Sequence, residues 1–135
     1  MDEILSVARI CKDIADLQPN ILVTGITKGG TFLASHFKEL VFQPKPDRLT
    51  TMLAQAQLMI GIPNTNKDFF GKVRFTMVCH DELHVFIFPL DSHYGEGQEE
   101  SDCCILIMVV MPPYDHTDLV QKTLGYIHNS TLCSH

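Results

Sequence analysis

A run of nine apolar residues near the C-terminal end, Cys103 to Met111, constrains the fold more than any other stretch of this chain. The run is too short to span a bilayer, and its β-branched residues and the two prolines after it favour a strand over a helix. Because successive side chains of a strand point to opposite faces, a strand without polar positions needs apolar cover on both sides. The run therefore predicts a strand in the middle of a sheet, with helices above and below.

Length and charge limit the number of domains and the classes of molecule that the chain can bind. A chain of 135 residues, 45% of them hydrophobic, fits one domain with a true core, so we expect a single domain over residues 1–135. The formal charge of -6 offers no basic surface for nucleic acid. The acidic start of the chain is unlike a signal peptide, and no apolar run has the length of a membrane span. These features predict a cytoplasmic protein that binds neither nucleic acid nor membrane, with its five cysteines reduced.

Apolar periodicity and turn residues predict the first half of the chain. Helical spacing predicts a helix in residues 1–18, ended by Pro19. Two β-rich runs in residues 20–37, joined by a turn with two glycines, predict a hairpin. A second helix is expected in residues 47–62, with Asp47 as its N-cap and with Gly61 and Pro63 closing it.

The second half is predicted to add three strands and a helix. Residues 64–71 have the composition of a loop, and the three strands are expected within residues 72–111. The first of these strands, Lys72 to Val78, alternates apolar and polar side chains. An acidic loop is expected at residues 91–102. A last helix is expected in residues 117–128, with Thr117 as its cap and with an apolar stripe facing the sheet, formed by Leu119, Val120, Leu124 and Ile127.

These elements predict an α+β protein with a three-layer α/β/α sandwich. The order is helix, two strands, helix, three strands, helix. A five-stranded antiparallel sheet of order 2-1-5-4-3 places the Cys103 to Met111 strand at the centre, which its composition requires.

This arrangement resembles the roadblock (dynein light chain), longin and profilin-like folds, and the roadblock superfamily most closely. Short segments also resemble an uncharacterised roadblock-like family of ammonia-oxidising archaea, namely residues 10–14, 25–34, 70–75 and 88–90. The resemblance implies a homodimer or a heterodimer in which the second helices pair and the third strands join into one continuous sheet. It also implies a scaffold or regulator for small GTPases and motors.

The residues themselves also favour association. Ala54 and Leu58 lie off the apolar stripe of the second helix, where an exposed helix would be polar, and this indicates a second contact surface. The third strand contains no proline and would leave an open hydrogen-bonding edge. The residues expected at a dimer or partner interface are Leu49, Met52, Leu53, Ala56, Met59, Val73, Phe75 and Met77.

No catalytic, cofactor-binding or metal-binding residues are expected. His80 and His84 have the spacing of a zinc-protease motif, but Glu82 comes one place too late and a turn is predicted there rather than a helix. In residues 28–31 the lysine precedes the glycines and a strand follows, which is the reverse of a phosphate loop. The first pattern predicts a solvated turn at His80 to His84, and the second predicts a hairpin turn at residues 28–31.

The leading hypothesis is therefore a non-enzymatic, dimeric scaffold or regulatory protein, with a small GTPase among its expected partners. One alternative is a PAS-like small-molecule sensor, which would bind its ligand between sheet and helix. An apolar pocket of about 300 Å³ or more would favour that alternative. Another is an enzyme of unknown type, which would need a convergent polar site. The sequence leaves the choice between homodimer and heterodimer open.

Overall fold

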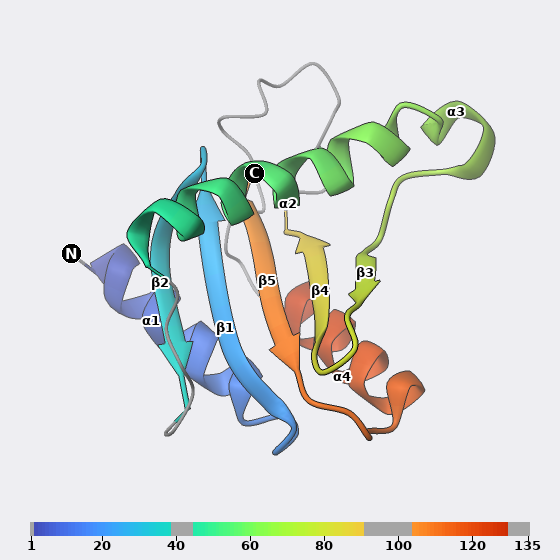
Figure 1. Cartoon of the computed structure of the whole chain (residues 1–135). Coiled ribbons are helices and arrows are strands. Elements are labelled where there is room, and N and C mark those ends of the chain that lie inside the picture. Colours follow the sequence, from blue (N-terminus) through green and yellow to red (C-terminus); the bar gives the residue numbers. More distant parts are fainter. Residues whose placement is uncertain (1, 39–44, 91–103, 130–135) are drawn as a thin grey trace.

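A five-stranded antiparallel sheet lies between two helical layers in the computed structural model, which describes residues 2–38, 45–90 and 104–129 (Figure 1). The sheet order is β2-β1-β5-β4-β3, as predicted. Helix α2 lies on one face, and α1 and α4 lie on the other (Figure 1). The strands are β1 Ile21–Lys28, β2 Thr31–Phe37, β3 Thr76–Cys79, β4 His84–Pro89 and β5 Cys104–Val110; the helices are α1 Asp2–Ala15, α2 Pro46–Asn64, α3 Lys67–Phe70 and α4 His116–Asn129.

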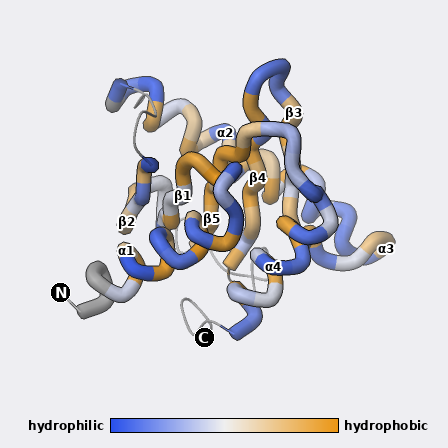
Figure 2. The backbone as a smooth tube through the Cα atoms, turned by 90° about the horizontal axis from the view of Figure 1, so that it is seen from below, coloured by the Kyte–Doolittle hydropathy of each residue, from blue (hydrophilic) through white to orange (hydrophobic). Residues whose placement is uncertain are grey.

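Strand β5 is central and buried on both faces, which confirms the prediction from its apolar run. It pairs with β1 on one side and β4 on the other. Ile105 and Ile107 pack with Ala56 and Ile60 of α2, whereas the alternate residues of β5 join the core beneath α1 and α4. The apolar segments in Figure 2 accordingly concentrate on the inner strands. One strand thus contributes to two separate cores.

Helices α1 and α4 are held to the sheet and to each other. Cys11 of α1 is fully buried, and its backbone carbonyl accepts a hydrogen bond of 2.6 Å from the Thr24 hydroxyl of β1. This bond satisfies a buried hydroxyl that would otherwise be costly. At the outer side of the two helices, the Tyr126 hydroxyl donates to Asp13, with an O–O distance of 3.0 Å. Leu119 of α4 is buried, as its predicted place on the apolar stripe requires.

The turn between β1 and β2 is a hairpin turn, as predicted. Gly29 and Gly30 have φ angles of 62° and 79°, which favour glycine because they lie in the left-handed region. The ladder pairs Lys28 with Thr31 directly across this turn. The residues that partly resemble a phosphate loop therefore close a hairpin.

Helix α2 differs from its prediction at both ends. It begins at Pro46, after Lys45, so Asp47 lies inside the first turn and is not the N-cap. It also continues past Gly61 and through Pro63 to Asn64. A proline removes the hydrogen bond to the carbonyl four residues earlier. Here that carbonyl, of Met59, accepts a 3.0 Å hydrogen bond from the Thr76 hydroxyl instead.

The segment after α2 also differs from its prediction. The expected loop at residues 64–71 contains the short helix α3, and the expected strand from Lys72 enters the sheet only at Thr76. Residues 71–75, here called the connector, lie outside the ladder. Within the connector, the Val73 backbone N–H donates to the Asn64 side-chain oxygen at 3.1 Å. The end of α2 thus holds Val73 before the chain reaches the sheet.

Two smaller predictions are also wrong. The cap of α4 is Asp115 rather than Thr117, because the Asp115 carboxylate accepts a 3.0 Å hydrogen bond from the backbone N–H of Asp118. Cys104 is disulfide-bonded, although Cys11 and Cys79 are free thiols as expected. The predicted acidic loop at 91–102 and the first residue of the predicted central strand, Cys103, lie outside the described residues.

We predict that Leu106→Ala lowers the free energy of unfolding by about 2–5 kcal/mol, because it leaves a cavity where a fully buried side chain fills the core. Met111→Ala, just after the same strand, should cost less than about 1 kcal/mol, because Met111 is 46% exposed. Urea denaturation followed by circular dichroism measures both. Equal losses would contradict the central position of β5.

Candidate interaction surface

Helix α2 has an apolar side chain on nearly every side. Leu53 and Ala56 are buried against the sheet, with 7% and 3% of their surface exposed, so these two predicted interface residues are core residues of this chain. Leu49 and Met59 are half-buried. The outward face of α2 is formed by Met52, Leu58 and Ile62, which are 40%, 54% and 63% exposed.

The predicted residues of the third strand contribute to both cores of the chain. Val73 packs against the cluster beneath α2, whereas Phe75 and Met77 pack against the cluster beneath α1 and α4. The Phe75 ring stacks on the Phe88 ring at a centroid distance of 5.5 Å. Because β3 has β4 as its single neighbour among the described strands, the feature that it offers to a partner is its backbone edge.

A row of valines crosses the α2 face of the sheet. Val23, Val109, Val85 and Val78 are direct neighbours across β1, β5, β4 and β3. Val109 points to the same face as Ile105 and Ile107, because side chains alternate along a strand. All four valines are half-buried, and α2 crosses the sheet nearer its other end (Figure 1). One helix therefore covers this face incompletely.

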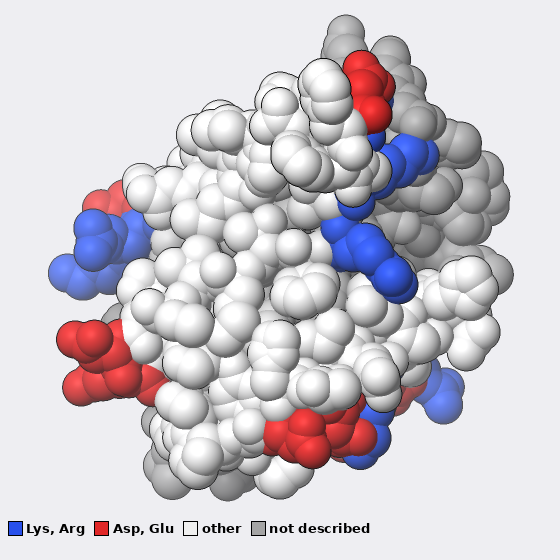
Figure 3. Space-filling model, turned by 90° about the vertical axis from the view of Figure 1, so that its right-hand side faces the viewer, with Lys and Arg blue, Asp and Glu red and all other residues white. Residues whose placement is uncertain are grey.

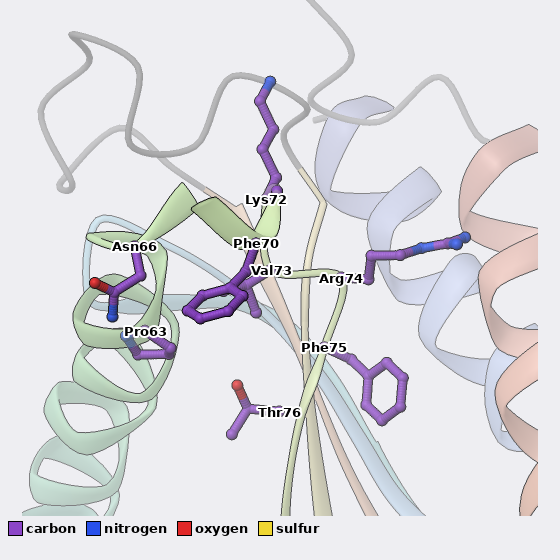
Figure 4. A pocket seen from close by; sticks show the side chains of 9 residues that line it. Pro63, Asn66, Phe70, Lys72, Val73, Arg74, Phe75 and Thr76 are labelled. Atoms are coloured by element: carbon purple, nitrogen blue, oxygen red, sulfur yellow. The ribbon is translucent and has the colours of Figure 1, made fainter. Parts of the chain in front are cut away.

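A hollow of about 390 Å³ lies where α2, α3 and the connector meet (Figure 4). Pro63 and Phe70 lie on one side of the hollow and the connector on the other (Figure 4). Its volume exceeds the 300 Å³ expected of a sensor pocket, but it is not the space between sheet and helix where a PAS-like sensor would hold a ligand. The lining residues are Pro63, Asn66, Phe70, Gly71, Lys72, Val73, Arg74, Phe75 and Thr76.

Positive charge gathers beside the hollow. Lys72 and Arg74 line the hollow, and Lys67 and the acid Asp68 lie in α3 next to it. The side of the molecule shown in Figure 3 has a largely uncharged centre, with lysine and arginine side chains beside it and acidic side chains toward the margins of the view.

The described residues contain no group of three or more His, Cys, Asp or Glu side chains that could hold a metal ion. His80 and the two acids after it are exposed. The His84 ring nitrogen Nδ1 lies 2.6 Å from the Tyr114 hydroxyl, and burial raises the pKa of Tyr114. None of the described helices has both the length and the hydropathy needed to cross a membrane.

Neither a family model nor a curated protein sequence matches the chain. Several solved structures do match it in fold. The gliding protein MglB of Thermus thermophilus is 7% identical, with a TM-score of 0.70 over 93% of this chain and 85% of that one. The Roadblock/LC7 domain from Streptomyces avermitilis is 16% identical, with a TM-score of 0.65 over 90% and 91%. The chain has a roadblock-like fold. MglC from Myxococcus xanthus, 9% identical, has a TM-score of 0.56 over 90% and 96%.

The roadblock-like fold confirms the predicted superfamily resemblance at the level of architecture. The closer likeness to an archaeal family stays a prediction. The sequence indicated the outward face of α2 through Met52, Leu58 and Ala54, and it did not identify Ile62 or the hollow. The signal available for the hollow was the pair Phe69 and Phe70, two large apolar side chains within a polar stretch.

We predict that iodoacetamide at pH 8 modifies Cys79 and spares Cys11 in the native protein. Cys79 is exposed at the end of β3, whereas Cys11 is fully buried and burial raises its pKa to about 11, which keeps the thiol protonated. Peptide mapping by mass spectrometry measures both sites. Denatured protein is the control, in which both should react. Equal native rates would contradict the described packing of α1.

Proposed function

We propose that the chain is a non-enzymatic scaffold or regulatory protein that acts as a dimer and has a small GTPase or signalling protein as its partner. The observation that carries the proposal is the outward face of α2, where Leu58 and Ile62 are more than half exposed beside an open sheet edge. Such a face is unusual for a monomer, because contiguous exposed apolar patches commonly mark interaction sites.

Covering this face would be favourable. Fully burying a leucine or isoleucine side chain contributes roughly 1.5–3 kcal/mol, so two half-exposed side chains on each of two chains supply several kcal/mol. A two-fold axis presents the same surface twice, so an apolar strip on one helix can pack against its own copy. Ala54 lies on the exposed side of α2 as well and would allow two helices to approach closely.

Strand β3 supports the same arrangement. Its ladder with β4 has only four residue pairs, from Thr76 to Cys79, and its other edge has no neighbouring strand among the described residues. An antiparallel copy of β3 would provide hydrogen-bonding partners for that edge. Pairing of this kind would extend the sheet through the dimer.

The row of valines favours a second helix beside α2. Met59 and Val85 both pack against the cluster beneath α2, yet the row from Val23 to Val78 stays half-buried. The α2 helix of a second copy, lying beside the first, would cover part of this row. In this proposal Leu53 and Ala56 hold α2 to its own sheet, and Met52, Leu58 and Ile62 contact the partner.

The proposal that the chain regulates a small GTPase is supported by the resemblance to roadblock proteins rather than by the exposed face of α2. The resemblance to roadblock proteins implies scaffolds and regulators of small GTPases, and the roadblock-like fold is consistent with it. A dimer with a continuous sheet would offer a broad, rigid platform, which suits the binding of a folded partner better than the turnover of a small substrate.

We predict that the protein has twice the 15.2 kDa mass of one chain at micromolar concentration, and that Leu58→Glu combined with Ile62→Glu makes it monomeric. The substitutions place charge on the proposed contact without entering the core. Light scattering after size exclusion measures the mass. Ala8→Glu, which adds one glutamate at an exposed position of α1, should stay dimeric. A wild-type monomer would contradict the dimer.

We also predict that the immobilised chain retains a small GTPase from native lysate and retains more of it in one nucleotide state. The lysate is loaded with GDP or with a non-hydrolysable GTP analogue, and mass spectrometry identifies the bound proteins. The L58E/I62E variant should retain less, because the platform is lost, whereas A8E should retain as much as the wild type. No GTPase in either state would contradict the regulatory proposal.

A further inference from the structure

Cys104 begins the central strand of the sheet and carries a disulfide bond. It is the first residue of β5 and is fully buried. It lies opposite Lys28 in the ladder with β1, and its backbone carbonyl accepts a hydrogen bond of 3.0 Å from the Leu90 N–H. The strand is therefore held on both sides at this residue. A disulfide here fastens its other cysteine to the most enclosed strand of the fold.

The other cysteine of this bond can be identified by elimination. The chain has five cysteines, of which Cys11 and Cys79 are free thiols. The two remaining candidates are Cys103 and Cys133. Adjacent Cα atoms lie about 3.8 Å apart across a trans peptide bond, whereas disulfides join Cα atoms that are usually about 4.4–6.8 Å apart. Cys103, directly before Cys104, is therefore too close, and Cys133 remains.

Helix α4 leads the chain back along the sheet from the end of β5. Near the start of α4, the Asp118 carboxylate accepts a hydrogen bond of 2.7 Å from Gln18, which precedes β1. The first residue of β1 pairs with Val110, at the end of β5. About two turns later in α4, the Tyr126 hydroxyl donates to Asp13 of α1. Figure 1 accordingly shows α4 running back behind the sheet.

The face of the sheet and the remaining length of chain both suit a bond to Cys133. Because side chains alternate along a strand, Cys104 lies on the same face as Leu106, which belongs to the cluster beneath α1 and α4. Ile127, in the last turn of α4, packs against that cluster too. Helix α4 ends at Asn129, and the four residues from there to Cys133 can span at most about 14 Å. That reach exceeds half the length of β5, which is about 20 Å.

We propose that Cys104 and Cys133 form a redox-controlled latch that holds the chain beyond α4 to the central strand. Closing the latch oxidises two protein thiols to one disulfide and reduces a small disulfide to two thiols, which take up the two protons. The Cys133 thiolate attacks the small disulfide first and releases one thiol, because Cys104 is buried. Cys104 then displaces the second thiol from the mixed disulfide. An excess of small thiol reverses both steps.

The latch closes a loop of residues 104–133, which contains all of α4. A cross-link restricts the unfolded chain, so closing the latch should stabilise the fold. Because disulfides are rare in reducing compartments, the latch would stay open there and close on oxidation. It needs neither a dimer nor a GTPase, so it goes beyond the proposed function and can be tested apart from it.

Peptide mapping tests the pairing in the full-length protein, which is incubated with oxidised glutathione and then alkylated with iodoacetamide. Trypsin cleaves after Arg74 and Lys122, so Cys103 and Cys104 share one peptide and Cys133 lies in another. The expected result is a disulfide between these two peptides, which is retained in Cys103→Ser and lost in Cys133→Ser. Alkylation of every cysteine, or a Cys103–Cys104 ring within one peptide, would overturn the proposal.

Thermal unfolding followed by circular dichroism tests the latch itself. Reduced glutathione should open the bond in the folded protein and lower the melting temperature by roughly 5–15 °C. Cys133→Ser should melt at the same temperature with and without the thiol, whereas the matched control Cys103→Ser should respond like the wild type. A bond that opens only in denaturant, or a wild type whose melting temperature does not change, would refute the latch.

Discussion

The structure depends on the burial of β5 on both faces. Each face needs its own apolar layer, since a strand without polar side chains is stable only where water reaches neither side. On one face Ile105 and Ile107 pack against α2, and on the other Leu106 and Met108 pack against residues of α1 and the neighbouring strands. Two hydrogen-bonded neighbours, β1 and β4, complete the enclosure. Helices on both faces follow from this one strand.

A central β5 also determines which strands form the edges. With β1 and β4 beside it, β2 and β3 are outermost. Soluble proteins commonly keep edge strands short, because a long open edge invites pairing with other chains. Here β3 pairs through only four residues, and the connector before it leaves the sheet. The exposed side chains of Phe69 and Phe70 precede this connector.

The sequence predicted the elements whose signal is local. The apolar run of β5, the glycines of the first hairpin and the helical spacing of α1 depend on neighbouring residues alone. The end of α2 could not be predicted in this way, because Pro63 stays in the helix through a hydrogen bond from Thr76 to the Met59 carbonyl. The connector is similarly predicted as strand, since its alternating pattern does not reveal the bond between Val73 and Asn64.

The difference between local and non-local signals also explains which residues of the candidate interaction surface the sequence predicted. The apolar stripe of the second helix marks the side chains that face the sheet. Two of the interface residues predicted from this stripe, Leu53 and Ala56, are therefore core residues. Of the outward residues, Met52 belongs to the stripe, and Leu58 is identifiable because it lies off the stripe. Ile62 is the last residue of the predicted helix, directly before Pro63, and the sequence offers no reason to select it.

Simple dimensions show why α2 has an exposed apolar end. Its 19 residues span about 28 Å at the usual rise per residue, whereas five strands span about 19 Å between the axes of the outermost two. A helix that crosses the strands therefore extends beyond the sheet edge, as α2 does toward α3 (Figure 1). Leu58 and Ile62, the most exposed apolar side chains of α2, lie in this C-terminal half of the helix. The proposed association at the sheet edge therefore involves the same helix that covers one face of the buried central strand.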